Sequence, residues 1–555
     1  MLPTSERGEG AGQAGALAAA AGPAVRAAPR RGLRAWQALP LAAAGGLALA
    51  AAFPSAGIWP LAAVGPAVLV ICLWQRSLRG SFLAGLVFAI AFFVPLLSWL
   101  VNVAWYAWAA LVGVDAVMFA VLAIGLRLLL RLRGWPLAVA GWWVAAEALR
   151  DRWPWGGFPW GRLSMSQASA PTLNWVSAGG PVVLTFLLAL AGACLAWVIL
   201  GSARQPGLLR RRMLPLACLV VVAGIALAGP ALPVNQPVPG TPTAVVAAVQ
   251  GNVPHARNLP DLLRATTVTT NHANATRQLA ARVAAGQVPA PRLVIWPENS
   301  TDQDPRLNPY IFNEIAGAVA SINRPVLVGA VLQNPVRNSG QLWLPGKGPV
   351  ADYVKRQLVP FGEVIPFRSF LSLFTSLPSL QPVNFTPGHR PVVFHVGQIR
   401  LGDVICYEVG FDGLVSSEVK AGANLLSVQT NDADFELDGQ TGETLQQLAM
   451  ARVRAVEHDR ALVVASTTGV SAIIAPDGKV ISETPLWQRA SIEARVPLRS
   501  GTTLADRLGG WPEGILTGAT AAALAWAIIA AAVAERRRVR VRAPRQAAPP
   551  PDAAE

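Results

Sequence analysis

The chain has 555 residues, of which 53% are hydrophobic and only 14% are charged, and its formal net charge is +15. These proportions differ from those of an average soluble protein and argue against a wholly soluble chain. A strongly basic chain often binds nucleic acid. Here, however, residues 235–510 carry 23 Lys and Arg against 22 Asp and Glu, and the positive surplus lies in short clusters between apolar runs and at both ends. This distribution is typical of membrane topology and argues against nucleic acid as a partner.

The length predicts at least two domains. Residues 1–33 are rich in Ala and Gly without apolar periodicity, so we expect a disordered cytoplasmic N-terminus. The first apolar run has no convincing cleavage site, and a cleaved signal peptide is therefore not expected. The other predicted units are a seven-helix transmembrane domain at 34–234, an extracytoplasmic α/β domain at 235–510, a C-terminal transmembrane helix at 511–535 and a disordered, basic and Pro-rich cytoplasmic tail at 536–555.

Eight apolar runs are interpreted as membrane spans, because a helix needs about 20 residues to cross a bilayer. The fifth run is short and contains Glu147, which weakens its assignment. The runs predict a polytopic α-helical membrane domain with about eight transmembrane helices. They cover residues 36–53, 58–75, 82–101, 105–130, 135–149, 174–200, 213–232 and 513–534.

Basic residues indicate how these spans are oriented. Every second connection is basic, and basic connections face the cytoplasm. Both termini are therefore predicted in the cytoplasm, and the polar domain is predicted outside, against the outer surface of the cytoplasmic (inner) membrane. The residues concerned are Arg26, Arg30, Arg31 and Arg34, then Arg76 and Arg79, Arg131 and Arg133, Arg210 to Arg212, and Arg536 to Arg538.

The polar domain alternates short apolar runs with helix-like stretches, which predicts a layered α/β domain. No Gly-rich phosphate loop and no metal-ligand spacing occur in it, so neither a cofactor nor a metal is expected. Strands are predicted at 245–249, 293–296, 326–332, 392–396, 401–406, 425–429, 462–466 and 472–475, and helices at about 260–285, 308–322, 411–421 and 441–459.

Cys406 is the one cysteine of the polar region, since Cys72, Cys194 and Cys218 lie in apolar runs. A lone cysteine that ends a strand-like run is a candidate nucleophile rather than half of a disulfide. It reacts as its thiolate and needs a base, because a free thiol has a pKa of about 8.5. None of the five histidines falls in a pairing pattern, and His458 is expected on a solvated helix face. A carboxylate is the remaining candidate.

Three further residues supply carboxylates and a cation. Glu298 follows an apolar strand, where side chains reach the carboxyl edge of a sheet and ligands bind. Taken singly, each residue has a structural interpretation. Glu298 suits a helix cap or the surface, Lys355 a solvated lysine, and Glu363 a loop salt bridge. None of these residues is a strong signal by itself, and it is their combination and order along the chain that indicate a catalytic site.

That order resembles a known set of motifs. Trp296-Pro297-Glu298, then Tyr353 to Glu363, then Ile405 to Glu408, is similar to the Glu-Lys-Cys triad of the nitrilase superfamily. With seven apolar runs before the polar domain and one after it, residues 36–535 resemble the apolipoprotein N-acyltransferase family, the membrane-embedded branch of that superfamily. The resemblance implies a nitrilase-like αββα fold for residues 235–510. Further matching motifs are Gly157–Trp160, Thr430–Asp432 and Met450–Glu457.

The resemblance implies a role for each matched residue. Glu298 would be the proton acceptor, Lys355 the cation at the oxyanion and Cys406 the nucleophile. Glu363 would either orient Lys355 or handle a proton, and the backbone N–H of Tyr407 would face the oxyanion. The remaining matched positions are Glu408 as a supporting carboxylate and Trp160, Asn431, Asp434 and Phe435 as candidate substrate-binding residues.

The implied reaction is a two-step acyl transfer without a cofactor. A membrane phospholipid donates an acyl chain to Cys406 as a thioester, and the N-terminal amine of the diacylglyceryl-cysteine of an apolipoprotein then accepts it. One departure from the family concerns the loop after Asn431-Asp432. Family members usually carry Trp-Phe-Gly there, whereas this chain has Asp434-Phe435-Glu436, which puts the acyl-contact role of the loop in doubt.

Two segments between the motifs keep alternative interpretations. The loop 150–162 places Trp153, Trp155, Phe158 and Trp160 either in the headgroup layer as an anchor or along a lipid-binding cleft. The apolar residues of 364–385 form either a mobile arm that dips into lipid or part of the domain core. The residues concerned in this second segment are Phe367, Phe370, Leu371, Leu373, Phe374 and Leu377.

Three other functions remain open at this point. The first is a membrane-tethered amidase that uses the same triad with water as acceptor. The second is a catalytically silent scaffold for a polyprenyl-phosphate mannosyltransferase, a partner that would act in trans. The third is a transporter, which should carry ionisable residues inside the membrane, and only Asp115 and Glu147 qualify.

Overall fold

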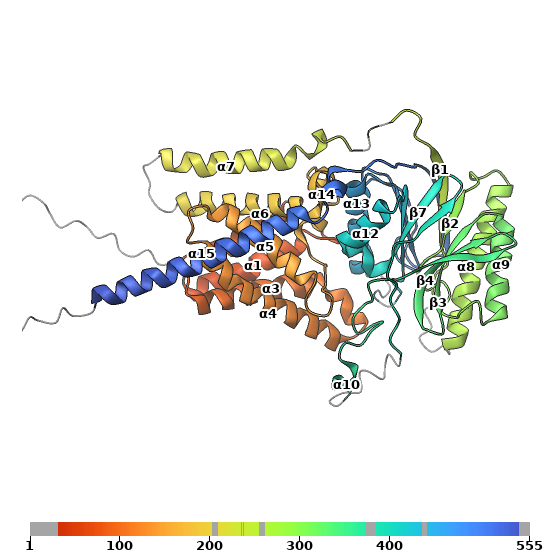
Figure 1. Ribbon diagram of the computed structural model, residues 1–555, viewed down its shortest axis with the longest axis horizontal. Helices are drawn as coiled ribbons and strands as arrows, with labels where there is room; N and C mark the ends of the chain where they lie inside the picture. The colour runs from red at the N-terminus through yellow and green to blue at the C-terminus, as the bar shows by residue number, and fades with distance from the viewer. Residues whose placement is uncertain are drawn as a thin grey trace, which may run out of the picture.

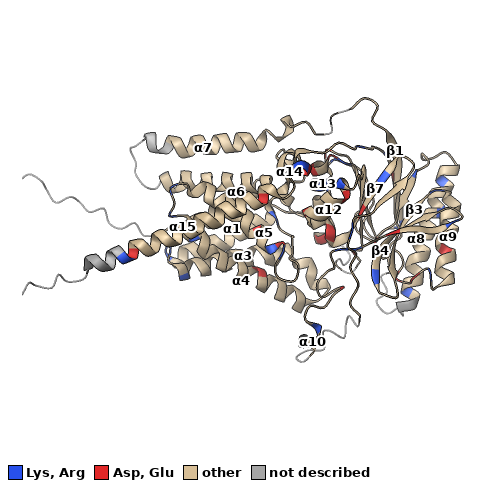
Figure 2. Cartoon of the chain, in the orientation of Figure 1, with Lys and Arg blue, Asp and Glu red and all other residues tan. Residues whose placement is uncertain are grey.

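The computed structural model describes residues 32–202, 209–234, 236, 238–254, 261–372, 383–433, 435 and 441–542. Most of the predicted tails, the basic residues Arg26 to Arg31, residues 373–382 of the apolar segment 364–385, and Asp434 and Glu436 lie outside these residues. Figure 1 shows two parts end to end, a helical bundle and a layered α/β domain. Figure 2 shows that charged residues are sparse along the bundle and more frequent over the α/β domain.

A helix occupies each of the eight predicted apolar runs. Four of them, α3, α4, α6 and α15, are long and apolar enough to cross a membrane, whereas α1, α2 and residues Met213–Leu227 of α7 are shorter apolar helices. The bounds are α1 (Ala35–Ala51), α2 (Leu61–Leu73), α3 (Leu78–Leu96), α4 (Trp105–Leu129), α5 (Trp135–Arg150), α6 (Val176–Ser202), α7 (Leu209–Leu227) and α15 (Trp511–Arg542).

Glu147 of α5 is held by three donors inside the bundle. Its carboxylate accepts from the Trp143 indole at 3.2 Å, the Leu163 backbone N–H at 2.8 Å and the Thr185 hydroxyl at 2.9 Å. A buried carboxylate with this many donors is a structural link. Glu147 therefore fastens the segment after α5 to both α5 and α6, which accounts for a charged residue in an apolar run.

The α/β domain contains two six-stranded sheets that face each other. Their strand orders are β12-β1-β2-β3-β4-β5 and β11-β10-β9-β8-β7-β6. The strands are β1 (Thr243–Gln250), β2 (Leu293–Ile295), β3 (Val326–Leu332), β4 (Arg337–Leu344), β5 (Gly348–Val354), β6 (Val393–Val396), β7 (Ile399–Ile405), β8 (Leu425–Thr430), β9 (Leu462–Ser466), β10 (Ala472–Ile474), β11 (Val480–Glu483) and β12 (Ala490–Pro497).

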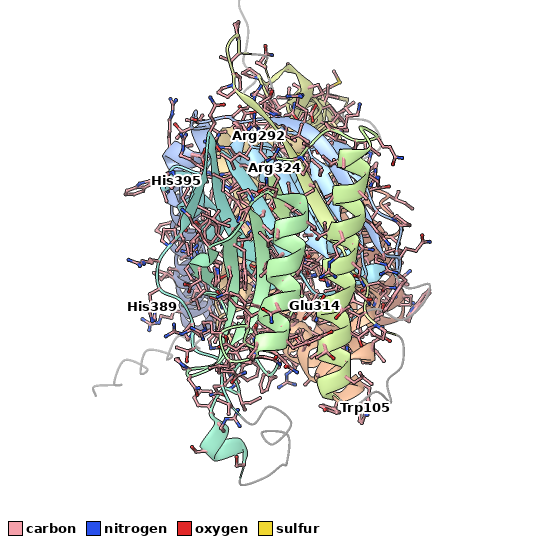
Figure 3. All side chains as sticks on the ribbon, turned by 90° about the vertical axis from the view of Figure 1, so that its right-hand side faces the viewer. Trp105, Arg292, Glu314, Arg324, His389 and His395 are labelled. Carbon is pink, nitrogen blue, oxygen red and sulfur yellow. The ribbon has the colours of Figure 1, made fainter. Side chains whose placement is uncertain are left out.

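Helices cover the outer face of each sheet, which completes four αββα layers (Figure 1). Helices α8 (Asp261–Ala284) and α9 (Pro309–Ile322) cover the first sheet, and Figure 3 shows them in front of it. Helices α12 (Asp412–Lys420) and α13 (Gly442–His458) cover the second sheet on the side of the bundle. The nitrilase-like fold class expected for this domain is confirmed. Shorter helices are η1 (Ser98–Asn102), α10 (Arg368–Leu371), η5 (Cys406–Gly410) and α14 (Leu504–Leu508).

The apolar pattern predicted eight of these strands and overlooked four, β4, β5, β11 and β12. Strand β4 reads Arg-Asn-Ser-Gly-Gln-Leu-Trp-Leu, yet Asn338, Ser339 and Gln341 in it are buried. Asn338 and Ser339 are buried together with partners that lie outside β4. Ser339, for example, donates to the Tyr353 carbonyl at 2.8 Å. Apolar periodicity cannot detect such a strand.

Helix α13 connects the α/β domain to the bundle. The Gln446 amide donates to the Leu96 carbonyl of α3 at 2.9 Å. At the other end of the helix, the expectation of a solvated His458 is wrong. Its side chain is 1% exposed, and its Nδ1 lies 2.7 Å from Asp506 Oδ1 on α14. Helix α13 is thus buried on the side of the bundle as well as on the side of the sheet.

Candidate active site

The predicted triad lies where strands of both sheets end. Glu298 follows β2 and Lys355 follows β5 of the first sheet, whereas Cys406 directly follows β7 of the second. The sheets face each other, so residues beyond these strand ends converge. All three side chains are buried, with exposed fractions of 6%, 1% and 6%.

Lys355 is held between two carboxylates. Its Nζ lies 2.9 Å from Glu298 Oε1 and 3.0 Å from Glu363 Oε1. The amide of Asn338 on β4 donates to the same two oxygens, at 2.7 and 2.8 Å. Burial alone would lower the pKa of Lys355, but Glu298 and Glu363 raise it well above its usual value. Lys355 is therefore an ammonium with a fixed position.

Glu298 is a buried carboxylate with donors on both oxygens. Its Oε2 accepts from the backbone N–H of Asn431, just after β8, at 3.0 Å. Burial raises the pKa of Glu298, and the positive charge of Lys355 opposes that rise. A carboxyl whose pKa is raised is a better proton acceptor near neutral pH than an ordinary one.

Cys406 begins the short helix η5 with a left-handed backbone, φ +52°. This conformation is uncommon outside glycine and often marks functional positions. Burial, and then the charge of Glu298, raise the pKa of the Cys406 thiol well above its usual value. This raised pKa favours the thiol over the thiolate, so a base would have to take the Cys406 proton before the sulfur could act as a nucleophile.

Glu408 fixes the turn that begins at Cys406. One oxygen accepts from the backbone N–H groups of Arg356 and Gln357, at 2.6 and 3.0 Å. The other accepts from the Tyr353 hydroxyl and the Ile405 N–H, at 2.8 and 2.7 Å. Its four bonds join the residues around Lys355 to the residues around Cys406, and so Glu408 holds the two chain segments in register.

The aromatic residues of loop 150–162 divide into two groups. Trp153 and Trp155 are 57% and 42% exposed, as an interfacial anchor requires. Trp160 is 2% exposed and stacks on Tyr407, with ring centroids 5.6 Å apart. The Tyr407 hydroxyl donates to the Gly157 carbonyl. The anchor interpretation is therefore wrong for Trp160, which packs on the residue that follows Cys406.

The remaining predicted substrate residues lie around the start of α13. Phe435 packs edge-to-face on Trp99 of η1, 5.4 Å between centroids, and its carbonyl accepts from Asn102 at 2.8 Å. The Asn431 carboxamide accepts from the Thr467 hydroxyl at 2.8 Å. Asp434 lies outside the described residues.

Three polar residues near the triad were not predicted. Besides Asn338, these are Gln447 and Glu443, one turn apart on α13. The Gln447 amide lies 3.7 Å from Cys406 Sγ and 3.2 Å from Glu443 Oε1. Their i, i+4 spacing is visible in the sequence, but a polar pair at that spacing is usually a solvated helix face. Only the packing of α13 against Cys406 distinguishes them.

In the part of the chain that the structure describes, the remaining side chains that could act as bases or metal ligands do not form a second site with the triad. Figure 3 shows His389 and His395 at the flank of the sheets. His272 on α8 is buried, and burial lowers its pKa to about 4, so it is neutral. Within the described ranges, no group of three or more His, Cys, Asp or Glu side chains has the arrangement of a metal site.

Comparison with known proteins places the whole chain in one family. Residues 45–194 match the apolipoprotein N-acyltransferase N-terminal domain, and residues 245–506 match the carbon-nitrogen hydrolase domain. The apolipoprotein N-acyltransferase of Mycolicibacterium smegmatis is 37% identical over 88% of this chain and 85% of its own. Those of Geobacter metallireducens and Azotobacter vinelandii are 29% and 30% identical over 90% and 92% of this chain, and over 95% and 97% of their own. Among solved structures, an amidase from Nesterenkonia sp. is 18% identical, covers 47% of this chain and 93% of its own, and has a TM-score of 0.34. The chain therefore belongs to the apolipoprotein N-acyltransferase family.

Proposed function

We propose that this chain transfers an acyl chain from a membrane phospholipid to the N-terminal amine of the diacylglyceryl-cysteine of apolipoproteins, through a thioester on Cys406. The observation that supports this most is the convergence of a buried thiol, a carboxylate with a raised pKa and a fixed ammonium. Those are the three groups that nucleophilic acyl transfer requires.

In the first half-reaction, Glu298 takes the proton of Cys406 and the thiolate attacks the ester carbonyl of the phospholipid. The ammonium of Lys355 and the backbone N–H of Tyr407 stabilise the oxyanion. The Glu298 proton then goes to the leaving alcohol, so that a lysophospholipid departs and the acyl chain stays on Cys406. Because Glu363 and Asn338 also bind Lys355 and Glu298, the base and the cation need little reorganisation during this step.

In the second half-reaction, the lipoprotein amine attacks the thioester carbon and Cys406 leaves. Glu298 accepts a proton from the attacking nitrogen and returns it to the thiolate. The enzyme thereby regains its resting thiol and carboxylate, and the product is an amide. No metal or organic group takes part in this scheme.

We also propose that all eight apolar helices cross the membrane, with both termini in the cytoplasm and the α/β domain outside. The domain boundaries are then 34–234, 235–510 and 511–535. Basic residues near every second connection support this orientation. An active site at the outer surface suits substrates that stay in the bilayer, since extracting a lipid costs about 0.8 kcal/mol for each CH₂ exposed to water.

A direct test is intact-mass analysis of the purified protein after incubation with phospholipid, followed by peptide mapping. We expect an acyl adduct on Cys406 that hydroxylamine removes, and none on Cys406→Ala. A folded protein that forms no adduct with any of several phospholipids would contradict the proposal. Hydrolysis of small amides without lipid would instead favour the tethered amidase, and association with a mannosyltransferase in the absence of an adduct would favour the scaffold.

A further inference from the structure

We propose that Gln447 of α13 is a further catalytic residue, whose side-chain amide donates an N–H to the Cys406 sulfur and stabilises its thiolate form in both half-reactions. The inference rests on the proposed function, since it takes Cys406 as the nucleophile. It gives the sulfur a hydrogen-bond donor that is separate from Lys355 and the Tyr407 N–H, the two donors that serve the carbonyl oxygen of the substrate.

The sulfur of Cys406 becomes an anion twice in the reaction. It attacks the phospholipid ester as a thiolate, and it leaves the thioester as a thiolate when the lipoprotein amine displaces it. Both events occur at a side chain that is 6% exposed, where little water reaches the charge. A buried anion is costly unless hydrogen bonds compensate for the lost water. The sulfur therefore needs a donor from the protein.

Gln447 places its amide nitrogen 3.7 Å from Cys406 Sγ. The Gln447 side chain is 2% exposed, so the amide meets the sulfur inside the protein. The same nitrogen lies 3.2 Å from Glu443 Oε1, one turn earlier on α13. A primary amide carries two N–H groups. One N–H therefore has Glu443 as its acceptor, and the other has the sulfur.

Helix α13 is fastened to the turn that begins at Cys406. Arg454, seven residues after Gln447, donates to the carbonyls of Val409 and Gly410 in η5, at 2.8 and 2.9 Å. Positions seven apart lie on the same face of a helix, because a turn takes 3.6 residues. The helix thus contacts η5 at two places about two turns apart, and the donor is in position before charge develops on the sulfur.

The other polar groups beside the sulfur have fewer protons to give. Thr430 also hydrogen-bonds to Cys406, but it has one hydroxyl proton and shares that proton with Asp432 Oδ1, at 3.0 Å. The Lys355 ammonium is held by two carboxylates. The Gln447 amide has a separate N–H for each of its two acceptors, and so it can donate to the sulfur throughout the reaction.

Three ionisable side chains act on the thiol from the elements packed around it. Burial raises the pKa of the Cys406 thiol most, and Glu298 and Glu443 raise it further, whereas Lys355 lowers it. Two of these three groups therefore disfavour the thiolate. A neutral amide stabilises the thiolate without adding a further charge to this set.

The bond from Gln447 to the sulfur becomes stronger as the reaction proceeds. The sulfur of a thiol is a weak acceptor. Hydrogen bonds to an ionised acceptor are roughly twice as strong as those between neutral groups. An interaction that strengthens as charge develops lowers the barrier, instead of only binding the resting state.

Gln447 neither gains nor loses a proton in this scheme. In acylation, Glu298 takes the thiol proton, a sulfur lone pair forms the C–S bond, and the π electrons of the carbonyl move to its oxygen. After the amine has attacked, the C–S bond breaks and its electron pair returns to the sulfur beside the Gln447 N–H. Glu298 then protonates the thiolate. The same N–H therefore assists both the attack and the departure of the sulfur.

The test uses Gln447→Met, which keeps the length of the side chain and removes its N–H groups. Gln447→Glu, a second variant of nearly equal size, replaces the amide by an acid. Gln398→Met is the control, because it is the same substitution at an exposed position just before β7.

The first measurement is the rate at which iodoacetamide alkylates Cys406 from about pH 6 to 10. Peptide mapping separates Cys406 from the other three free cysteines, and the rate follows the thiolate fraction because the thiolate is the reactive form. The second measurement is the rate of acylation by phospholipid and of discharge of the isolated acyl-enzyme by hydroxylamine.

We expect the alkylation profile of Gln447→Met to move upward by about 1–2 pH units, the effect of one hydrogen bond to a charged group. At a fixed pH below the transition, this shift is an about 10- to 100-fold lower alkylation rate. Gln447→Glu should shift the profile in the same direction. Acylation and hydroxylamine discharge should slow in both variants, and Gln398→Met should behave as the parent.

Alkylation profiles of both Gln447 variants that coincide with that of the parent would overturn the inference. Slower acylation with unshifted profiles would also overturn it, because Gln447 would then act through packing and not on the sulfur. If the parent forms no acyl adduct on Cys406 while the profile of Gln447→Met still shifts, the proposed function fails and the bond to the sulfur stands. The two failures are therefore distinguishable.

Discussion

Arg162 and Asp412 form a two-point ion pair between the loop after α5 and the first residue of α12, at 2.7 and 2.9 Å. Asp412 also accepts from Arg454 of α13 at 2.6 Å, and Arg454 in turn donates to the carbonyls of Val409 and Gly410 in η5. One carboxylate therefore connects the bundle, α13 and the turn that begins at Cys406.

We expect Asp412→Asn to destabilise the protein, because two buried guanidinium groups lose their shared anion. Breaking a buried pair from one side typically costs about 3–5 kcal/mol. Thermal unfolding in detergent measures the effect. Glu314→Gln, which removes the half-exposed pair with Arg277, should change stability by less than about 1 kcal/mol. Equal stability of the two variants would contradict the assigned role of Asp412.

The pH dependence of this stabilisation has a definite sign. Burial alone would raise the pKa of Asp412, but Arg162 and Arg454 hold it well below its usual range. A group with a depressed folded-state pKa stabilises the fold above its unfolded pKa, about 3.9, and loses that contribution as the pH falls through the folded value. The stability difference between the parent and Asp412→Asn should therefore shrink below about pH 4.

Glu298→Gln should slow acyl-enzyme formation by a factor of about 10²–10⁴, the usual contribution of a positioned general base. The thiol of Cys406 has a raised pKa, so without a base little of it ionises near neutral pH. The rate is measured by mass spectrometry of the adduct in samples quenched at successive times. Normal acylation by a folded Glu298→Gln protein would remove Glu298 from the base role.

The acylation rate should fall at low pH, and Asn338 should set the pH at which this fall occurs. Acylation requires unprotonated Glu298, whose pKa burial raises, so the rate should increase with pH through a value above the usual carboxyl pKa of about 4.3. The Asn338 amide stabilises the charged carboxylate at 2.7 Å. Asn338→Leu should therefore shift this limb to higher pH. The neighbouring Ser339→Ala, which loses a bond to Tyr353 instead, should leave it in place.

Two tryptophans of loop 150–162 should give opposite results. Trp160→Ala removes a buried ring that stacks on Tyr407, and we expect a loss of about 3–5 kcal/mol of stability together with slower acylation. Trp153→Ala alters a ring that is 57% exposed, and its thermal unfolding in detergent should stay close to that of the parent. Similar destabilisation by Trp160→Ala and Trp153→Ala would contradict the assignment of a buried packing role to Trp160 and an exposed position to Trp153.

The sequence predicts those parts of the structure whose signal is local. Apolar runs located the helices of the bundle and eight strands. Motif order along the chain led to three residues that the structure brings near one another, and their catalytic roles stay a prediction. The rest depends on contacts between distant segments. Asn338 lies on a strand without apolar alternation, His458 is buried because α14 folds back to supply Asp506, and Glu443 and Gln447 look like an exposed helix face. No local pattern encodes these partners.

Consecutive glutamines of α13 have different partners. Gln446 donates to the end of α3, whereas Gln447 lies beside the Cys406 sulfur. Because the two glutamines are neighbours on one helix, the position of the Gln447 amide at the Cys406 sulfur depends on how α13 is seated against α3. A fragment that lacks the bundle would therefore lose the contact with α3 that helps to position this amide.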